Sequence, residues 1–110
     1  MISFLPPMSR NEKINAYIGF SIKSGKIVYG YESILLNKKR IYLILCDRAL
    51  SPNSLKKVER FTVEKNIKSY LIEDLSAYFG GRRIKCVGIG EEHLASAIEN
   101  ELNNTVGGSD

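Results

Sequence analysis

Glycines and bases that could hold a phosphate group lie close together between Gly25 and Asp47. Gly30 precedes a short apolar segment that is expected to be helical, and the first amides of a helix are free to bind an anion. Lys26 lies shortly before Gly30, and the basic run Lys38-Lys39-Arg40 follows the apolar segment. These residue types favour binding of a phosphate-bearing ligand, and RNA is the hypothesis that they raise.

Residues that could carry out catalysis are scarce. His93 is the only histidine, and its acidic neighbours on an expected helix favour a surface position over a catalytic one. Gly88-Ile89-Gly90 lies where a nucleotide-binding loop would lie. However, His93 replaces the third glycine of that loop, and Glu91 and Glu92 would repel a phosphate. We therefore expect no enzymatic activity, no metal site and no cofactor.

The basic residues are distributed unevenly along the chain. Residues 1–90 contain all 16 Lys and Arg against 7 acids, a formal charge of +9. Residues 91–110 contain 5 acids and no base, so the C-terminal part is acidic. A basic body suits binding to a polyanion, because each neutralised phosphate releases counterions. The alternative is that the charge serves solubility alone.

Length and composition indicate one globular domain. A chain of 110 residues is long enough for one core, and 44% hydrophobic with 25% charged residues excludes a disordered or membrane-spanning protein. The start, Met1–Pro7, has no basic leader, so we expect no secretory signal or transit peptide. Cys46 and Cys86 lack metal-ligand spacing and are expected to be core thiols rather than a disulfide. A cytoplasmic protein without membrane association is predicted.

Apolar spacing predicts helices that alternate with four short strands. The expected elements are a helix from the capping box Ser9–Glu12 to Gly25, a strand Ile27–Tyr29, a helix after Gly30 with Tyr31, Ile34 and Leu35 on one face, a strand Ile41–Cys46, a helix from Ser51-Pro52 to Asn66, a strand Ser69–Ile72, a brief helix opened by Asp74 and ended by Gly80-Gly81, a strand Ile84–Ile89 and a helix from Gly90 to Leu102. This order predicts an α/β fold, a three-layer α-β-α sandwich with a central four-stranded mixed sheet. Residues 1–10 are expected to form an N-terminal extension, residues 11–102 the domain and residues 103–110 a flexible tail.

The order of glycines and apolar strands resembles that of the ribosomal L-seven-Ae / L-thirty-e superfamily. The matching features are the segment Gly19–Gly30, the strand Ile41–Cys46, Lys56-Lys57, Gly80-Gly81 and the strand Ile84–Ile89. The resemblance covers residues 12–102 and is closest to the short bacterial paralogues of the YlxQ type. It implies the same three-layer fold and binding to kink-turn RNA, a bent duplex whose elbow contains sheared G-A pairs. A ribosomal or translation-related protein is a further candidate partner.

In that family, three segments hold the RNA elbow, and the resemblance places them here at Gly30–Ser33, Asp47–Asn53 and Gly80–Arg83. Amides and bases hold phosphates in such a site, while side chains at the helix start read base edges. The resemblance and the basic runs together assign the following residues to RNA binding: Lys26, Gly30, Tyr31, Glu32, Ser33, Lys38, Lys39, Arg40, Arg48, Leu50, Arg82 and Arg83.

Three side chains depart from the family where base readout takes place. The family usually has Asn, then Glu, then a Lys three residues further on, whereas this chain has Glu32, Ser33 and Leu36. Glu32 lacks an amide donor, Ser33 is too short to reach a guanine edge, and Leu36 removes a cation. Each lost pair would cost about 1–3 kcal/mol, by analogy with base readout in duplexes. The sequence therefore predicts altered or weakened kink-turn specificity.

Arginines in the other two segments could retain affinity, because Arg48, Arg82 and Arg83 can bind phosphates or stack on bases. A solvated turn at Arg82-Arg83 and a favourable helix-dipole position for Lys38–Arg40 are the alternatives. Leu50 could stack on a base or contact a protein. Two functions thus stay open: a non-enzymatic RNA-binding protein, or a protein-interaction module that uses Leu50, Tyr31 and the acidic last helix.

Overall fold

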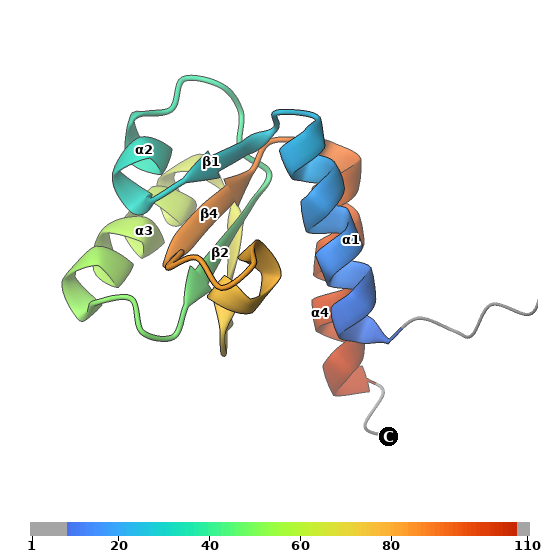
Figure 1. The fold of residues 1–110 in the computed structure, drawn as a ribbon. Helices are drawn as coiled ribbons and strands as arrows, with labels where there is room; N and C mark the ends of the chain where they lie inside the picture. The colour runs from blue at the N-terminus through green and yellow to red at the C-terminus, as the bar shows by residue number, and fades with distance from the viewer. Residues whose placement is uncertain (1–8, 108–110) are drawn as a thin grey trace, which may run out of the picture.

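The computed structural model describes residues 9–107 (Figure 1). Helices and strands alternate along the chain as the sequence predicts. In order, the elements are α1 (Arg10–Lys23), β1 (Ile27–Tyr29), α2 (Tyr31–Leu36), β2 (Leu43–Asp47), α3 (Pro52–Lys65), β3 (Lys68–Ile72), the 3-10 helix η1 (Leu75–Phe79), β4 (Cys86–Ile89) and α4 (Glu92–Gly107).

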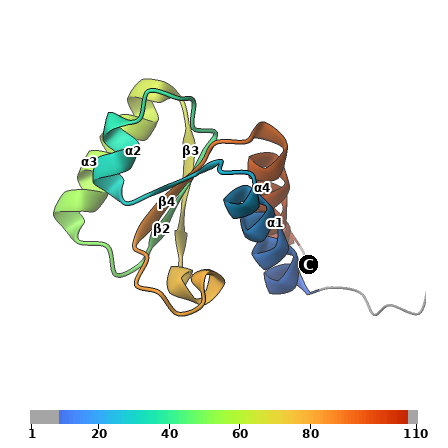
Figure 2. The same ribbon diagram turned by 45° about the horizontal axis from the view of Figure 1, so that its top comes forward.

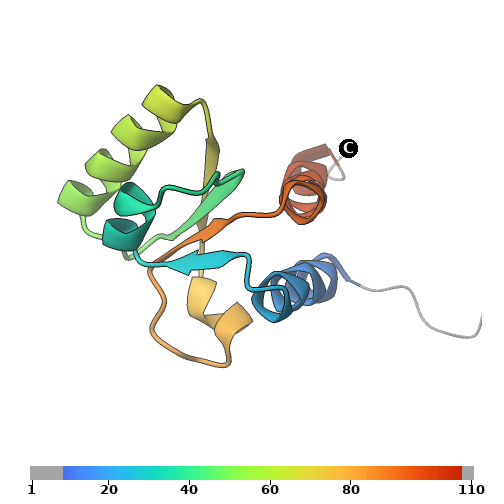
Figure 3. The same cartoon turned by 90° about the horizontal axis from the view of Figure 1, so that it is seen from above.

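The four strands form one mixed sheet in the order β1-β4-β2-β3. β4 is antiparallel to both β1 and β2, whereas β2 and β3 are parallel. Seen from above in Figure 3, α2 and α3 cover one face of the sheet, and α1 and α4 lie together on the other. The turned view of Figure 2 shows the same separation, with η1 at one end of the sheet. The predicted three-layer α-β-α sandwich is therefore confirmed.

Two apolar clusters fill the spaces between the layers. The first, against α1, α4 and η1, includes the fully buried Ile18, Leu43 and Ile98. The second, against α2 and α3, includes Ile34 and Val58. Because β2 contributes alternate residues to both clusters, it is buried along its whole length, as its unbroken apolar sequence predicted.

The helix ends follow the predicted capping signals. Ser9 and Glu12 form a reciprocal capping box, in which the Glu12 amide donates to Ser9 Oγ and the Ser9 amide donates to Glu12 Oε1. Ser51 caps α3 through its hydroxyl, which accepts from the Ser54 amide, and Pro52 occupies the first turn. Asn66 ends α3 in the left-handed conformation, with φ at 56°.

The strands differ from their predicted ranges at the starts. β2 begins at Leu43 rather than Ile41 and ends at Asp47, β3 begins at Lys68 rather than Ser69, and β4 begins at Cys86 rather than Ile84. Ile41 is apolar because its side chain packs in the second cluster. The Ile84 amide donates to Ser76 Oγ (3.1 Å), so this residue is tied to η1 instead of the strand ladder. Ile41 and Ile84 are therefore buried outside the sheet, and their apolar side chains looked like strand residues in the sequence.

The last helix is longer than the sequence predicted. It continues to Gly107, so the predicted flexible tail of residues 103–110 begins as helix, and residues 108–110 lie outside the described part. The hydroxyl of Tyr70 in β3 donates to Asn103 Oδ1 (3.1 Å), which holds the helix against the sheet beyond Leu102. At the N-terminal end, most of the predicted extension, residues 1–8, lies outside the described residues, and Arg10 already belongs to α1.

The two cysteines are core residues, as the sequence predicted. Cys46 and Cys86 are each 1% exposed and face one another across β2 and β4, with 3.5 Å between the sulfur atoms. Both are free thiols. The hydrogen bond with Cys46 and burial raise the pKa of the Cys86 thiol, which keeps it protonated.

One carboxylate joins the end of β2 to two other segments. Asp47 is only 8% exposed, and its Oδ1 accepts from the Ala49 amide (2.7 Å) while its Oδ2 accepts from the Leu75 amide (2.8 Å). The sequence predicted that Asp74 would cap η1, but Asp74 makes no side-chain hydrogen bond to that helix. Asp47, distant in sequence, satisfies the first amide of η1 instead.

We expect Asp47→Ala to lower the free energy of unfolding by about 2–4 kcal/mol, since it removes two charge-assisted hydrogen bonds and leaves a buried amide without a partner. Urea denaturation measures this loss. The matched control is Asp74→Ala, which removes an exposed carboxylate and should change stability by less than about 0.5 kcal/mol. Equal losses in both variants would contradict the assignment.

Candidate nucleic-acid interface

Sheet topology brings the three predicted RNA-contact segments to one end of the sheet. β1 and β2 end where β4 begins, because β4 is antiparallel to both. The Gly30 amide donates to the Cys86 carbonyl and the Asp47 amide donates to the Lys85 carbonyl, each at 2.8 Å. We call the surface made by Gly30–Ser33, Asp47–Asn53 and Gly80–Arg83 the loop edge. These segments are far apart in sequence, and all three lie at the same end of the sheet.

Two adjacent arginines extend from the loop edge. Arg82 and Arg83 are exposed and follow Gly80 and Gly81, whose φ angles of +66° and +81° allow the tight turn after η1. The Arg82 guanidinium lies over the Tyr29 ring, with its carbon 5.5 Å from the ring centroid. This cation-π contact orients Arg82 while leaving its nitrogens available to an anion.

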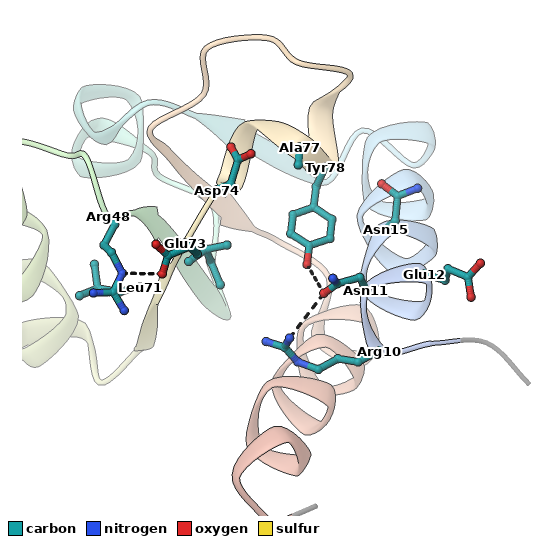
Figure 4. Close-up of a pocket in the computed structure, with 11 residues that line it drawn as sticks. Arg10, Asn11, Glu12, Asn15, Arg48, Leu71, Glu73, Asp74, Ala77 and Tyr78 are labelled. Carbon is teal, nitrogen blue, oxygen red and sulfur yellow. Dashed lines mark hydrogen bonds and ion pairs between the residues drawn. The ribbon is translucent and has the colours of Figure 1, made fainter. Parts of the chain in front are cut away.

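Arg48 has a different environment from the other two arginines. Its Nε lies 3.0 Å from Glu73 Oε1, and both side chains are largely exposed (Figure 4). A phosphate would have to compete with Glu73 for this guanidinium. Because exposed ion pairs are weak, Arg48 can change partner at small cost, but it is not an uncompensated cation.

The two apolar residues predicted at this interface are partly buried. Leu50 and Tyr31 both pack against the second core cluster, so Leu50 does not project freely from its loop. The Lys57 ammonium of α3 lies 5.8 Å from the centroid of the Tyr31 ring. Lys57 was not among the predicted contacts, although its position early in the helix after the second segment could have indicated it.

The residues that replace the expected base readers are all on the surface of α2. Glu32 and Ser33 are exposed in its first turn, and Leu36 at its end is 81% exposed. Gly30 precedes them with φ at 87° and ψ at 143°, a conformation that residues other than glycine rarely adopt. α2 has only six residues, so its dipole is small. The exposed arginines, rather than this helix start, provide the positive charge of the edge.

The basic run does not belong to the loop edge, which corrects the expectation of a single anion site between Gly25 and Asp47. Lys26 precedes β1, and Lys38-Lys39-Arg40 precede β2, so all four lie where these strands begin. They line a hollow at the opposite end of the sheet from Gly30. β2 has five residues, and a strand rises about 3.3 Å per residue, so about 15 Å separates the two groups.

A further hollow lies beside the N-terminal end of α1 and carries charges of both signs. Arg10, Asn11, Arg48, Glu73 and Asp74 are among its lining residues (Figure 4). The hydroxyl of Tyr78 donates to Asn11 Oδ1 at 2.8 Å and closes one side of it. Acids balance the bases in this hollow, so it is a poor site for a polyanion.

His93, the one histidine in the sequence, lies on the surface near the start of α4. The His93 side chain is 92% exposed, and within the described part of the chain its one hydrogen-bond partner is Glu91, whose carboxylate also accepts from the Leu94 amide at the start of α4. The hydrogen bonds from the Leu94 and His93 amides lower the pKa of Glu91.

Within residues 9–107, no three His, Cys, Asp or Glu side chains form a group that could hold a metal ion. No helix in that range has the length and apolar character needed to cross a bilayer.

Comparison with known proteins identifies the fold. No protein family matches this sequence, and neither does any curated protein. Solved structures do share the architecture. One is a protein with unknown function from Bacillus halodurans, which is 12% identical and superposes with a TM-score of 0.73 over 83% of this chain and 97% of that chain. The similarity supports the same arrangement of helices and strands in both molecules.

Proposed function

We propose that this protein is a non-enzymatic RNA-binding protein of the cytoplasm that contacts structured RNA through the loop edge. The observation that carries this proposal is the meeting of three segments, Gly30–Ser33, Asp47–Asn53 and Gly80–Arg83, at one end of the sheet. The resemblance to the L-seven-Ae / L-thirty-e superfamily assigns RNA to the same three segments. Ribosomal or kink-turn-like RNA is therefore the proposed partner.

Phosphate contacts supply most of the affinity in this proposal. Arg83 is exposed and has no carboxylate partner among the described residues, and Arg82 is oriented by Tyr29. Lys57 and Lys85 add positive charge nearby. Arginine forms planar, two-pronged hydrogen bonds with phosphate, which suits contacts to an RNA backbone.

Base readout is reduced in this proposal. Glu32 places a carboxylate where the family has an amide, and the exposed Leu36 replaces a cation. A negative charge at the start of α2 opposes the close approach of a phosphate. We therefore propose recognition of RNA shape, with a weaker preference for the kink-turn than in the family that the chain resembles.

The alternative, a protein-interaction module, has less to support it. Its proposed contacts were Leu50, Tyr31 and the acidic last helix. Leu50 and Tyr31 already pack against the second core cluster, so their apolar surface is largely used within the domain. The acids Glu99 and Glu101 of α4 pair with Lys68 and Lys13 of the same chain. These two side chains would have to give up their ion pairs to meet a basic partner.

Gel retardation of a structured RNA at low and moderate salt tests the arginine contacts. We expect Arg82→Ala plus Arg83→Ala to weaken binding and to reduce the slope of log K against log salt by about 1 per arginine. The matched control is Lys56→Ala plus Arg60→Ala, which removes the same charge from exposed positions of α3. An equal loss in the control, or no retardation of RNA by the wild-type protein at low salt, would refute the proposal.

Restoring the family's side chains tests the loss of readout. The triple variant Glu32→Asn, Ser33→Glu and Leu36→Lys changes only exposed residues of α2, so the fold should be retained. We expect the wild type to bind a kink-turn RNA and a matched duplex without the bulge with similar affinity. The triple variant should prefer the kink-turn by about tenfold or more, since each base contact contributes about 1–3 kcal/mol. A strong kink-turn preference in the wild type, or no gain in the variant, would show that these positions do not govern specificity.

A further inference from the structure

A second basic surface lies at the end of the sheet opposite the loop edge. A hollow of about 550 Å³ is lined there by residues that include Lys26, Lys38, Lys39, Arg40, Tyr42 and Gly90. We call it the Lys26 hollow. A smaller hollow adjoins it, shares the Lys38–Arg40 wall and adds Lys65 at the end of α3. The strand order brings these bases together from three separate parts of the sequence.

The charge of the side chains that line the Lys26 hollow is unbalanced. Glu91 and Glu92 follow Gly90 but do not line the hollow, and the Glu91 carboxylate accepts from the His93 and Leu94 amides of α4 instead. Five bases and no acid are among the residues that line the two adjoining hollows. Among the described residues, no carboxylate lies within ion-pairing distance of Lys26, Lys38, Lys39 or Arg40. The hollow beside α1 differs, because acids accompany its arginines. Several like charges held together without a counter-ion favour an anion at that place.

The backbone and a ring hold part of this wall in position. Asn37 Oδ1 accepts from the Lys39 amide at 2.7 Å, which fixes the turn that carries the basic run. The Arg40 guanidinium lies over the Tyr42 ring, with its carbon 4.9 Å from the centroid. On the other side, the Gly90 amide donates to the Lys26 carbonyl at 2.8 Å and joins the start of β1 to the end of β4. These hydrogen bonds and the ring contact therefore hold the segments that carry the cations in position.

Helix dipoles account for only some of these charges. Lys23 and Lys65 lie in the last turns of α1 and α3, where a base is favoured without any ligand. The basic run lies beyond the end of α2, and its C-cap residue Asn37 is extended, with φ at −70° and ψ at 131°. Lys38, Lys39 and Arg40 thus lie beyond the last turn of α2.

We propose that the Lys26 hollow is a second phosphate-binding site, separate from the loop edge. Lysine and arginine without acidic partners recognise the charge and oxygens of phosphate groups, and a hollow of about 550 Å³ falls within the size range of small-ligand sites. The phosphates come either from the backbone of an RNA or from a free phosphorylated ligand. The site does not depend on RNA binding at the loop edge.

Amide chemical shifts of the ¹⁵N-labelled full chain test the proposal with two probes, sodium tripolyphosphate and a short structured RNA, each titrated at low salt. We expect saturable shifts in residues 25–28, 37–42 and Gly90. The variant Lys38→Gln plus Lys39→Gln should weaken binding of the probe about tenfold or more, because it removes two charge-assisted contacts. Its spectrum also reports whether the fold is intact.

The control Lys56→Gln plus Arg60→Gln changes the net charge equally on the exposed face of α3 and should bind like the wild type. Shifts with RNA alone identify an RNA backbone as the source, and shifts with tripolyphosphate alone identify a free ligand. Absence of shifts with both probes, or shifts that persist in the Lys38→Gln plus Lys39→Gln variant, would overturn the proposal. Arg82→Ala plus Arg83→Ala should leave these shifts unchanged, which separates this site from the loop edge.

Discussion

The carboxylate of Asp47 is the constraint on which the arrangement of the loop edge depends. It is buried at the end of β2 and accepts one amide from its own loop and one from η1, which leads to the arginine turn. The backbone amide of the same residue donates to the Lys85 carbonyl, just before β4 begins. Asp47 thereby joins two of the three segments of the edge at a fixed separation. Loss of the carboxylate would free the first amide of η1 and so weaken the link between the arginine turn and the loop after β2.

Much of the fold could be predicted from local sequence. Capping side chains such as Ser9 and Ser51 set helix starts through contacts with residues three positions away, so their effect is visible in the sequence itself. Strand starts were less predictable, because Ile41 and Ile84 are buried without joining the sheet ladder. α4 continues past Leu102, where Asn103 accepts from the hydroxyl of Tyr70 in a distant strand, and no local pattern reveals such a contact.

The candidate site could be predicted only in part, because the order of basic residues in a sequence does not show at which end of the sheet each one lies. Gly30 and the run Lys38–Arg40 are neighbours in the chain, yet α2 and the return to β2 place them at opposite ends of the sheet. The pairing of Arg48 with Glu73 and the packing of Leu50 are likewise tertiary contacts. A family resemblance predicted that the three segments of the loop edge act together, and the sheet topology gives the physical reason for their proximity.

Hydrogen exchange of backbone amides, with and without a bound structured RNA, tests most directly whether the loop edge is the binding surface. The account predicts slower exchange in residues 30–33, 47–53 and 80–85 when RNA is added, with α1 and the outer face of α3 unchanged. Binding of RNA without protection in these three segments, or with protection confined to α1 and α4, would contradict it.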